Sequence, residues 1–451
     1  MIIVGARCSG SPLATMLARS GLSVCLLDRA TFPSDTPSTH GIQPPGVKVL
    51  ERLGVLDRLL ETTRPVEDGL IAFNDLRIEA HGISRVLGAP MLNVRRVTLD
   101  AALLEAAVAA GAEARTGTNV TGLLRTDGRV TGVETGNGPL RARLVVGADG
   151  ARSTVARLLG AREYHRTPGR RIFVWSYFEG VDPEERRVWL GEIGEDGFLA
   201  SPTDAGLFLA AFVAPSERWD ELRRDRQRGF EEGIARWTEL RQRLAAGRQV
   251  GPARMMSRWH GYFRESAGPG WVLLGDAGHF KDPTPGQGIA DALRQAEALA
   301  PAIERSLAAP APNDEPLREW WEWRDHDAWE MYWFAQGVGR TEQAPGLMRA
   351  FQARLAADPE LVDGLIRVLG HDLPPSKLFG PSLMLSVLGE AIRANPRRGP
   401  RLLAEAGWLA RDELRHPRKP RRPRRRKAMP GRDPASPRPT DAQPVTPFTT
   451  G

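Results

Sequence analysis

The fold is decided by residues 2–28, which read IIVGARCSGSPLATMLARSGLSVCLLD. Residues 2–4 are an apolar run typical of a buried parallel strand, and residues 11–19 have the apolar spacing of a helix. A second apolar run covers residues 23–27 and ends at Asp28. This order of strand, glycine turn, helix, strand and acid is typical of a dinucleotide-binding βαβ unit.

The turn residues have separate physical roles in such a unit. Gly5 permits the tight turn, Gly10 lets helix and strand approach closely, and the free N–H groups of the helix start face a pyrophosphate. Asp28 is placed to accept a hydrogen bond from a ribose hydroxyl. Arg7 replaces the middle glycine of the G-x-G-x-x-G pattern, where it hinders close backbone approach but offers a guanidinium to a phosphate. The alternative is an ordinary βα turn.

Composition describes a globular protein of one large fold or about three average domains. Of 451 residues, 41% are hydrophobic and 26% charged. No apolar run of about 18 residues predicts a membrane span, and charged residues interrupt the start as they would not in a signal peptide. The two cysteines predict no disulfide framework, and we expect a cytoplasmic protein. Because Met1 nearly begins the first strand, we expect a few residues of that strand to be missing.

The basic charge is concentrated in the last 37 residues. Eleven Lys/Arg and two Asp give residues 415–451 a net charge of +9; subtracting this from the total of +7 leaves −2 for the other 414 residues. This Pro/Arg-rich tail is predicted to be disordered. Binding to nucleic acid or an anionic membrane is an alternative, but no aromatic interleaving accompanies the charge, so no specific nucleic-acid binding is expected.

The pattern of elements predicts an α/β protein, α+β overall. A Rossmann-like core is expected to carry an inserted antiparallel sheet and C-terminal helices. The predicted parts are a discontinuous core (1–164 and 263–340, with strands near 66–94 crossing to a second layer), a substrate domain (165–262), C-terminal helices (341–414) and the tail (415–451).

Several local patterns make sharper predictions. Residues 46–60 are predicted as one helix, residues 140–146 as one strand, and residues 216–245 as two amphipathic helices. An Asp-Gly turn at residues 126–129 predicts a hairpin. Five tryptophans between residues 320 and 333 are expected to serve core and interhelix packing.

Three separated motifs now combine. They are Gly5-Ala-Arg-Cys-Ser-Gly10, then Gly147-Ala-Asp-Gly150 with Arg152, then Gly275-Asp276 with Pro283-Thr-Pro-Gly-Gln-Gly288. In this order they resemble the FAD-dependent monooxygenases of the para-hydroxybenzoate hydroxylase type, the group A flavoprotein hydroxylases. The resemblance covers about residues 1–340.

The resemblance implies a set of FAD contacts. Ser9 lines the pyrophosphate, Asp28 the adenosine ribose and Asp276 the ribityl chain, while the backbone from Gly286 onward faces the pyrimidine edge of the flavin. The implied cofactor-binding residues are Gly5, Arg7, Ser9, Gly10, Asp28, Arg29, Arg96, Val120, Asp149, Gly150, Arg152, Gly275, Asp276, Pro283, Gly286, Gln287, Gly288 and Ile289.

Three of these residues have plain alternatives. Asp149 can stabilise a turn between strand and helix. Arg96 can be a surface cation, with Arg95 as its rival for the cofactor, and Asp276 can be a helix N-cap.

The resemblance also implies the chemistry. NAD(P)H reduces FAD, O2 gives a C4a-hydroperoxyflavin in a dry pocket, and a small or polycyclic aromatic substrate is hydroxylated or epoxidised. The protein supplies positioning, water exclusion and a base for a phenol. No metal site is expected, because the eight histidines show no ligand spacing.

Candidate catalytic residues are His40, Trp175, Tyr177 and Pro283. His40 lies where the family often carries an arginine, and the two aromatics alternate on a strand expected to face the ring. His279 is expected to be structural.

Alternatives remain within the same superfamily. Phe280-Lys-Asp-Pro283 resembles a motif of flavin-dependent halogenases and geranylgeranyl reductases. The halogenase Trp-x-Trp-x-Ile-Pro signature is absent, and Gly286-Gln-Gly288 favours the hydroxylases. A prenyl or alkene reductase is the alternative function.

Overall fold

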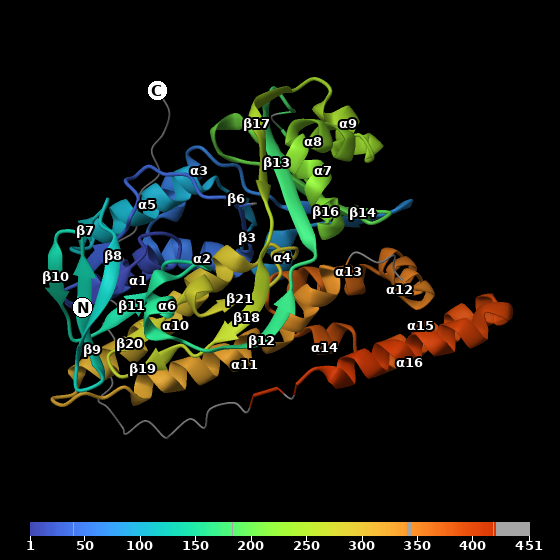
Figure 1. Cartoon of the computed structure of the whole chain (residues 1–451). Helices are drawn as coiled ribbons and strands as arrows, with labels where there is room; N and C mark the ends of the chain where they lie inside the picture. Colours follow the sequence, from blue (N-terminus) through green and yellow to red (C-terminus); the bar gives the residue numbers. More distant parts are fainter. Residues whose placement is uncertain (39, 183, 341–344, 418, 421–451) are drawn as a thin grey trace, which may run out of the picture.

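The computed structural model describes residues 1–38, 40–182, 184–340, 345–417 and 419–420 (Figure 1). Residues 421–451 of the predicted tail therefore lie outside the described residues. No helix in the described ranges is long and apolar enough to cross a membrane.

The first sheet has six strands in the order β19-β20-β11-β1-β2-β7, and only β19 is antiparallel to its neighbour. Its strands are β1 (Ile2–Val4), β2 (Cys25–Leu27), β7 (Glu113–Arg115), β11 (Val145–Gly147), β19 (Ala267–Gly268) and β20 (Trp271–Leu273). Such a sheet buries both faces, which explains its short runs of apolar residues.

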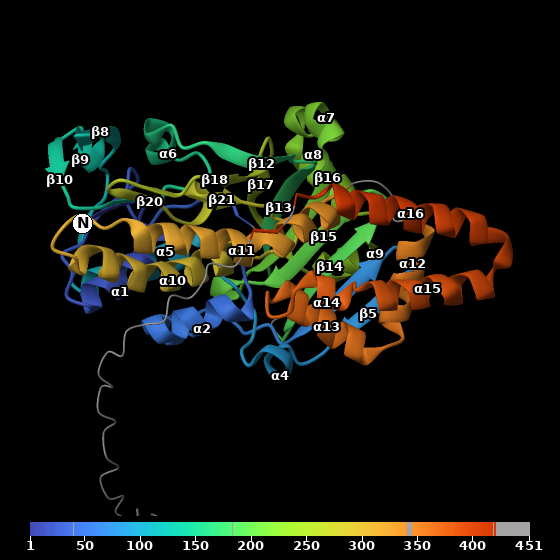
Figure 2. The same cartoon turned by 90° about the horizontal axis from the view of Figure 1, so that it is seen from below.

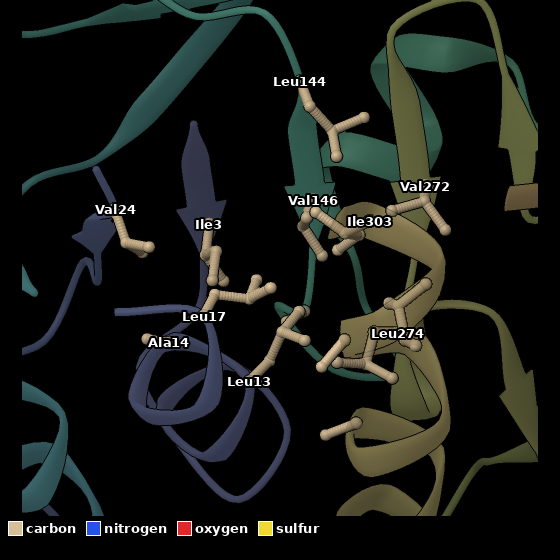
Figure 3. Packing of buried hydrophobic residues seen from close by; sticks show 14 of the residues in the cluster. Ile3, Leu13, Ala14, Leu17, Val24, Leu144, Val146, Val272, Leu274 and Ile303 are labelled. Carbon is tan, nitrogen blue, oxygen red and sulfur yellow. The ribbon is translucent and has the colours of Figure 1, made fainter. Parts of the chain in front are cut away.

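Alternate side chains of β1 meet different layers. Ile3 packs with Leu13 and Leu17 of α1 (Gly10–Arg19) and with Ile303 of α10 (Gly288–Ala308) (Figure 3). Ile2 instead packs with the hairpin layer on the opposite face. That layer contains β8 (Val120–Thr126), β9 (Arg129–Thr135), β10 (Gly138–Arg141) and α6 (Thr154–Leu159). This helix–sheet–hairpin arrangement is Rossmann-like.

The second sheet has seven strands in the order β17-β13-β16-β15-β14-β4-β5 and is antiparallel except at the β14–β4 pair. It is made of β4 (Asp68–Phe73), β5 (Leu76–Ala80), β13 (Arg171–Glu179), β14 (Arg187–Ile193), β15 (Asp196–Pro202), β16 (Phe208–Pro215) and β17 (Arg248–Met256). One face packs on α7 (Trp219–Arg224), α8 (Arg226–Ile234) and α9 (Thr238–Leu244). Residues 66–94 thus contribute two strands to this sheet, as expected.

Smaller elements connect the two sheets. Two small sheets contain β3 (Gly41–Ile42) with β6 (Leu92–Asn93), and β12 (Glu163–Pro168) with β18 (His260–Arg264) and β21 (His279–Phe280). The connecting helices are α2 (Pro44–Leu53), α3 (Leu56–Leu60), α4 (Ile83–Leu87), α5 (Arg96–Ala109) and α11 (Glu315–Val338). Within α11, Trp320 and Trp329 are buried in core clusters, as predicted for packing residues.

The C-terminal helices cover part of the second sheet. They are α12 (Gly346–Ala356), α13 (Pro359–Leu369), α14 (Pro375–Leu378), α15 (Pro381–Ala394) and α16 (Gly399–Arg415). Phe351 of α12 and Ile366 of α13 pack in one cluster with Ile71 and Ile78 of the second sheet. Figure 2 shows α15 and α16 side by side, extending beyond the body.

The fold class is confirmed, whereas three local predictions are wrong. The predicted helix at 46–60 is two helices, because Gly54 adopts a left-handed conformation (φ 72°) and ends the first. The predicted strand at 140–146 is divided between β10 in the hairpin layer and β11 in the parallel sheet. Residues 216–245 form three α-helices, since Asp225 caps a new helix through its side chain.

Candidate active site

The three sequence motifs meet at the carboxyl ends of neighbouring parallel strands, the usual ligand-binding edge of such sheets. A Cβ atom added to Gly5 would lie 2.3 Å from the Ala148 carbonyl oxygen, and one on Gly10 would lie 1.9 Å from that of Gly5. A Cβ on Gly275 would lie 2.3 Å from Ser9 Oγ. The motifs are therefore in direct contact, and glycine is required at each junction.

Asp28 is buried beside the first glycine turn. Its carboxylate accepts hydrogen bonds from the backbone N–H groups of Ala6 and Ala30, each at 2.8 Å. The N–H of Thr118 donates to the Asp28 carbonyl, which brings the start of β8 at Val120 to the same edge. Arg29 is exposed. Each carboxylate oxygen of Asp28 keeps a further lone pair for a ribose hydroxyl.

A buried carboxylate, Asp100, joins two of the four predicted cofactor arginines, Arg7 and Arg96. Arg7 Nη1 lies 2.9 Å from Asp100 Oδ2, and Arg96 Nε donates to Asp100 Oδ1 at 3.0 Å. Asp100 is fully buried, and Arg7 also donates to Ser34 Oγ. Sequence reasoning missed Asp100, although its i+4 spacing from Arg96 on a helix is a signal for such a pair. Because Arg7 has these partners, any phosphate contact is shared with them.

The neighbouring arginine has a different partner. Arg95 binds Asp204 through its backbone N–H, Nε and Nη2 at 2.9 to 3.1 Å. Burial raises the pKa of Asp204, but hydrogen bonds from Arg95 and Thr98 more than offset it and lower the pKa below its usual value. Arg96, by contrast, is buried beside Cys8 and Asp276. The structure thus separates the roles of the two arginines.

The Asp149 side chain stabilises the turn that begins α6. It accepts from Ser153 Oγ at 2.5 Å and from the N–H groups of Thr154 and Val155 at 2.6 and 3.2 Å. Burial raises its pKa. Gly150 has φ 78° and Arg152 is exposed. The turn interpretation of Asp149 is therefore confirmed, and its contact with a cofactor stays a prediction.

Asp276 lies inside a short 3₁₀ turn, Gly275–Ala277, whose N-cap is Leu274, so the N-cap interpretation is wrong. Its carboxylate receives no hydrogen bond from the part of the chain that the structure describes. Burial raises its pKa to about 6, although the nearby Arg96 lowers it. A partly buried carboxylate in this position fits a ligand that brings hydroxyl donors.

Residues 283–288, which we call the proline–glycine loop, lead into α10. Gly286 N–H donates to the Pro283 carbonyl at 2.9 Å, and Gly286 has φ 66°. Among the described residues, no side chain caps the first turn of α10, so its N–H groups are open to a ligand. Gln287 directs its side chain to Lys281, and Ile289 packs in the core, which leaves only their backbones for a cofactor.

The second sheet meets this loop through His40 and Tyr177. His40 Nε2 and Tyr177 Oη share a short hydrogen bond, and the rings stack at 5.8 Å. Burial lowers the pKa of His40 to about 3, helped by Arg96, and burial raises the pKa of Tyr177 to about 12. Both side chains are therefore neutral at pH 7. A Cβ on Gly41 would lie 3.8 Å from the Gly286 carbonyl, which places His40 beside the proline–glycine loop.

Three buried polar groups near this junction have no partner among the described residues. They are His40 Nδ1, both amide atoms of Asn93, and Trp175 Nε1. Asn93 pairs with Gly41 between two short strands, and Trp175 lies on the same face of β13 as Tyr177. Sequence reasoning missed Asn93. Because buried polar groups are normally satisfied, we predict that a bound ligand supplies partners to this cluster.

The ring of His279 contacts other residues than those of this cluster. Its ring packs on Phe263 at 4.5 Å and on Tyr332 at 5.8 Å, and burial lowers its pKa well below the usual value. These contacts agree with the structural role expected of it.

Together these features fit FAD. The glycine junctions and the uncapped start of α1 offer backbone N–H groups to a pyrophosphate. Asp28 and Asp276 offer acceptors to hydroxyl groups, and the open start of α10 offers donors to a ring edge.

The family comparison agrees with this geometry. A family described as FAD binding domain matches residues 1–315, and the chain belongs to this family. The predicted resemblance to FAD-dependent flavoproteins is therefore confirmed at the family level, and FAD is the cofactor.

Individual proteins of known name are similar to the chain. Rifampicin monooxygenase from Streptomyces venezuelae is 30% identical over 302 residues, which cover 64% of this chain and 60% of that protein. The chain thus spans less than two thirds of that relative. Menaquinone reductase from Mycolicibacterium smegmatis is 30% identical over 327 residues, covering 64% and 72%. The flavin-dependent brominase Bmp2 has the same fold, with a TM-score of 0.69, 19% identity, and coverage of 87% and 99%.

Proposed function

We propose that the protein is an FAD-dependent monooxygenase. It takes electrons from NAD(P)H and uses O2 to hydroxylate or epoxidise a small or polycyclic aromatic molecule. The observation that carries the proposal is the neutral His40–Tyr177 pair, which lies with unpartnered buried polar groups beside the proline–glycine loop. The name of the relative rifampicin monooxygenase supports it.

The surroundings of this pair favour an aromatic substrate. One face of the second sheet carries an apolar cluster, which contains Phe173, Trp175 and Tyr177 of β13 and Leu209 and Val213 of β16. Such a face excludes water and stacks on a planar ring. Reduced FAD supplies the activation of O2 for transfer to an electron-rich carbon.

The chain's own residues orient the substrate and hold its proton. Because His40 and Tyr177 are both neutral, one hydrogen bond fixes their relative orientation and leaves His40 Nδ1 free for a further partner. A substrate hydroxyl at Nδ1 or at Tyr177 Oη would be held in one position, with its proton passed along the pair. We assign Trp175 and Pro283 to the walls of the proposed substrate pocket.

An arginine-lined cavity of about 670 Å³ lies beside the Asp149–Gly150 turn. Arg152 and Arg157 line it, are exposed, and have no acidic partner in the described ranges; Arg166 and Arg264 both pair with Glu163. Guanidinium groups suit phosphates, so we place the phosphates of NAD(P)H here. This placement assigns Arg152 to NAD(P)H and not to FAD. Replacing both Arg152 and Arg157 by Ala should therefore raise the KM for NAD(P)H about tenfold in steady-state kinetics, while the flavin absorbance of the purified protein stays unchanged.

The proposal is tested by oxygen uptake. FAD-loaded protein is supplied with NADPH or NADH and a panel of phenols and polycyclic aromatics. Substrate-stimulated uptake, with NAD(P)H oxidised in step, is the expected result. Flavin reduction without any oxygen uptake across the panel would contradict it.

A second candidate function is reduction of a prenyl-type alkene. It is favoured by Phe280-Lys-Asp-Pro283 and by the name of the relative menaquinone reductase. This activity transfers hydride without oxygen. An isoprenoid quinone whose side chain gains two hydrogens under anaerobic turnover with NAD(P)H, measured by mass spectrometry after the quinone ring is reoxidised, would establish it in place of the monooxygenase.

A further inference from the structure

A buried network of polar side chains supports the proline–glycine loop. Lys281 Nζ lies 2.6 Å from Gln287 Oε1 and 2.6 Å from Asp291 Oδ2. All three residues are buried, with 1 to 7% of their surface exposed. A buried charge is stable only when paired, so these side chains fix one another and hold the loop between them.

The remaining partners come from the C-terminal helices. Gln287 Nε2 donates to the Leu369 carbonyl at 2.9 Å and to the Val368 carbonyl at 3.3 Å. His371 Nδ1 lies 3.1 Å from Asp291 Oδ1 and 2.9 Å from Arg294 Nη1, so His371 joins an Asp291–Arg294 pair. Its φ of 58° turns the chain sharply after α13. These residues follow the loop by about 80 positions and lie outside residues 1–315, which the FAD-binding family matches.

We propose that residues 368–371 form a latch that positions FAD. The latch binds the side chains of Gln287 and Asp291, and so fixes the backbone N–H groups of residues 287 and 288, which this proposal directs to the flavin. Because both ends of the Gln287 amide are occupied by Lys281 and by the latch carbonyls, its side chain has no remaining role toward the cofactor. Val368, Leu369 and His371 are positioning residues; none of them needs to touch FAD.

This inference rests on FAD binding and is independent of the oxygen chemistry. If the loop loses one or two buried hydrogen bonds, it samples conformations in which its N–H groups no longer point together at the flavin. A loss of about 1.4 kcal/mol weakens binding tenfold. The latch therefore predicts that cofactor affinity depends on residues beyond the family's matched region.

The test measures the Kd of FAD for the full-length apoprotein by flavin fluorescence. Gln287→Leu and His371→Gly remove the two sides of the latch, and glycine keeps the positive φ without strain. Each should weaken FAD binding about tenfold. His371→Asn, which tolerates positive φ and retains a donor, should recover most of the affinity. The matched control is His416→Ala, which removes a ring stacked at 4.2 Å on Trp333 in the same helical layer.

Thermal unfolding of each apoprotein is recorded beside the affinity. The proposal predicts that FAD binds more weakly to variants whose apoprotein has a thermal unfolding midpoint no lower than that of His416→Ala. Wild-type affinity in both Gln287→Leu and His371→Gly, or an equal loss in His416→Ala, would overturn it. If the wild-type protein binds FAD but consumes no oxygen, the proposed monooxygenase fails and the latch result still stands.

Discussion

The nucleotide end and the sheet end of the site are built by different means. At the nucleotide end, glycines and backbone N–H groups make the binding surface, and a Cβ at Gly5, Gly10 or Gly275 would collide with the neighbouring motif. At the sheet end, side chains such as His40 and Tyr177 make it. A binding surface made of backbone groups tolerates few substitutions, whereas one made of side chains can be built from many different residues. We therefore expect the first end to define the cofactor and the second to define the substrate.

The two ends also handle charge differently. Asp276 at the nucleotide end lacks a hydrogen-bond donor among the described residues and has a raised pKa. Asp204 near the sheet end is bound by Arg95 and Thr98 and has a lowered pKa. The carboxylate of Asp276 thus keeps its hydrogen-bond acceptors for a ligand, whereas Arg95 and Thr98 already donate to the carboxylate of Asp204. Changes at the nucleotide end should act on FAD affinity and stability, and changes at the sheet end on turnover.

The largest effect is expected at the first turn. Gly10→Ala places a Cβ 1.9 Å from the Gly5 carbonyl, so the strand and helix must separate. We expect a loss of more than about 4 kcal/mol in the free energy of unfolding and no FAD retained. Urea unfolding and the flavin absorbance of purified protein measure this. Gly337→Ala is the control and should retain FAD, because an added Cβ there meets no described residue outside the backbone of its own helix within 4 Å.

The next effect contrasts the two carboxylates. Because the folded pKa of Asp276 is about 6, above its value of 3.8 in the unfolded chain, ionisation opposes folding as pH rises from about 4 to 6. Asp276→Asn should stabilise the apoprotein at pH 7 by about 3 kcal/mol, a gain that disappears below pH 4, while weakening FAD binding. Urea midpoints between pH 4 and 7 measure it.

Asp204→Asn should change the free energy of unfolding in the opposite direction. Since the folded pKa of Asp204 lies below its unfolded value, its ionised form stabilises the fold, and this stability is lost as pH falls through the folded pKa. The variant should therefore be less stable than wild type at pH 7. Equal pH profiles for the two variants would show that the two ends do not differ in charge.

The smallest change in energy is expected at the sheet end. Tyr177→Phe removes the hydroxyl that bonds His40 but keeps the aromatic face. We expect kcat to fall about tenfold with FAD affinity unchanged, because the pair acts on the substrate and not on the cofactor. A loss of FAD equal to the loss of turnover would place Tyr177 at the cofactor instead.

The difference between the ends also explains what the sequence could predict. Gly5, Gly10 and Asp28 belong to a pattern imposed by backbone geometry, so the parallel sheet and its cofactor follow from it. Asp100 and the partners of Gln287 depend on contacts between distant segments, for which a single sequence carries little signal. Sequence reasoning missed the division of residues 140–146 between two sheets because only residues 142–144 separate the two strands and no glycine or proline marks the break.

The central claim is that the sheet end directs activated oxygen onto a bound substrate. It is tested most directly by turnover with NADPH under ¹⁸O2 and an aromatic substrate that stimulates oxygen uptake, with mass spectrometry of the product. The account predicts one ¹⁸O atom in the product of the wild-type protein and about tenfold less labelled product per unit time from Tyr177→Phe. A product that gains two hydrogens and no ¹⁸O, formed equally well without oxygen, would contradict it.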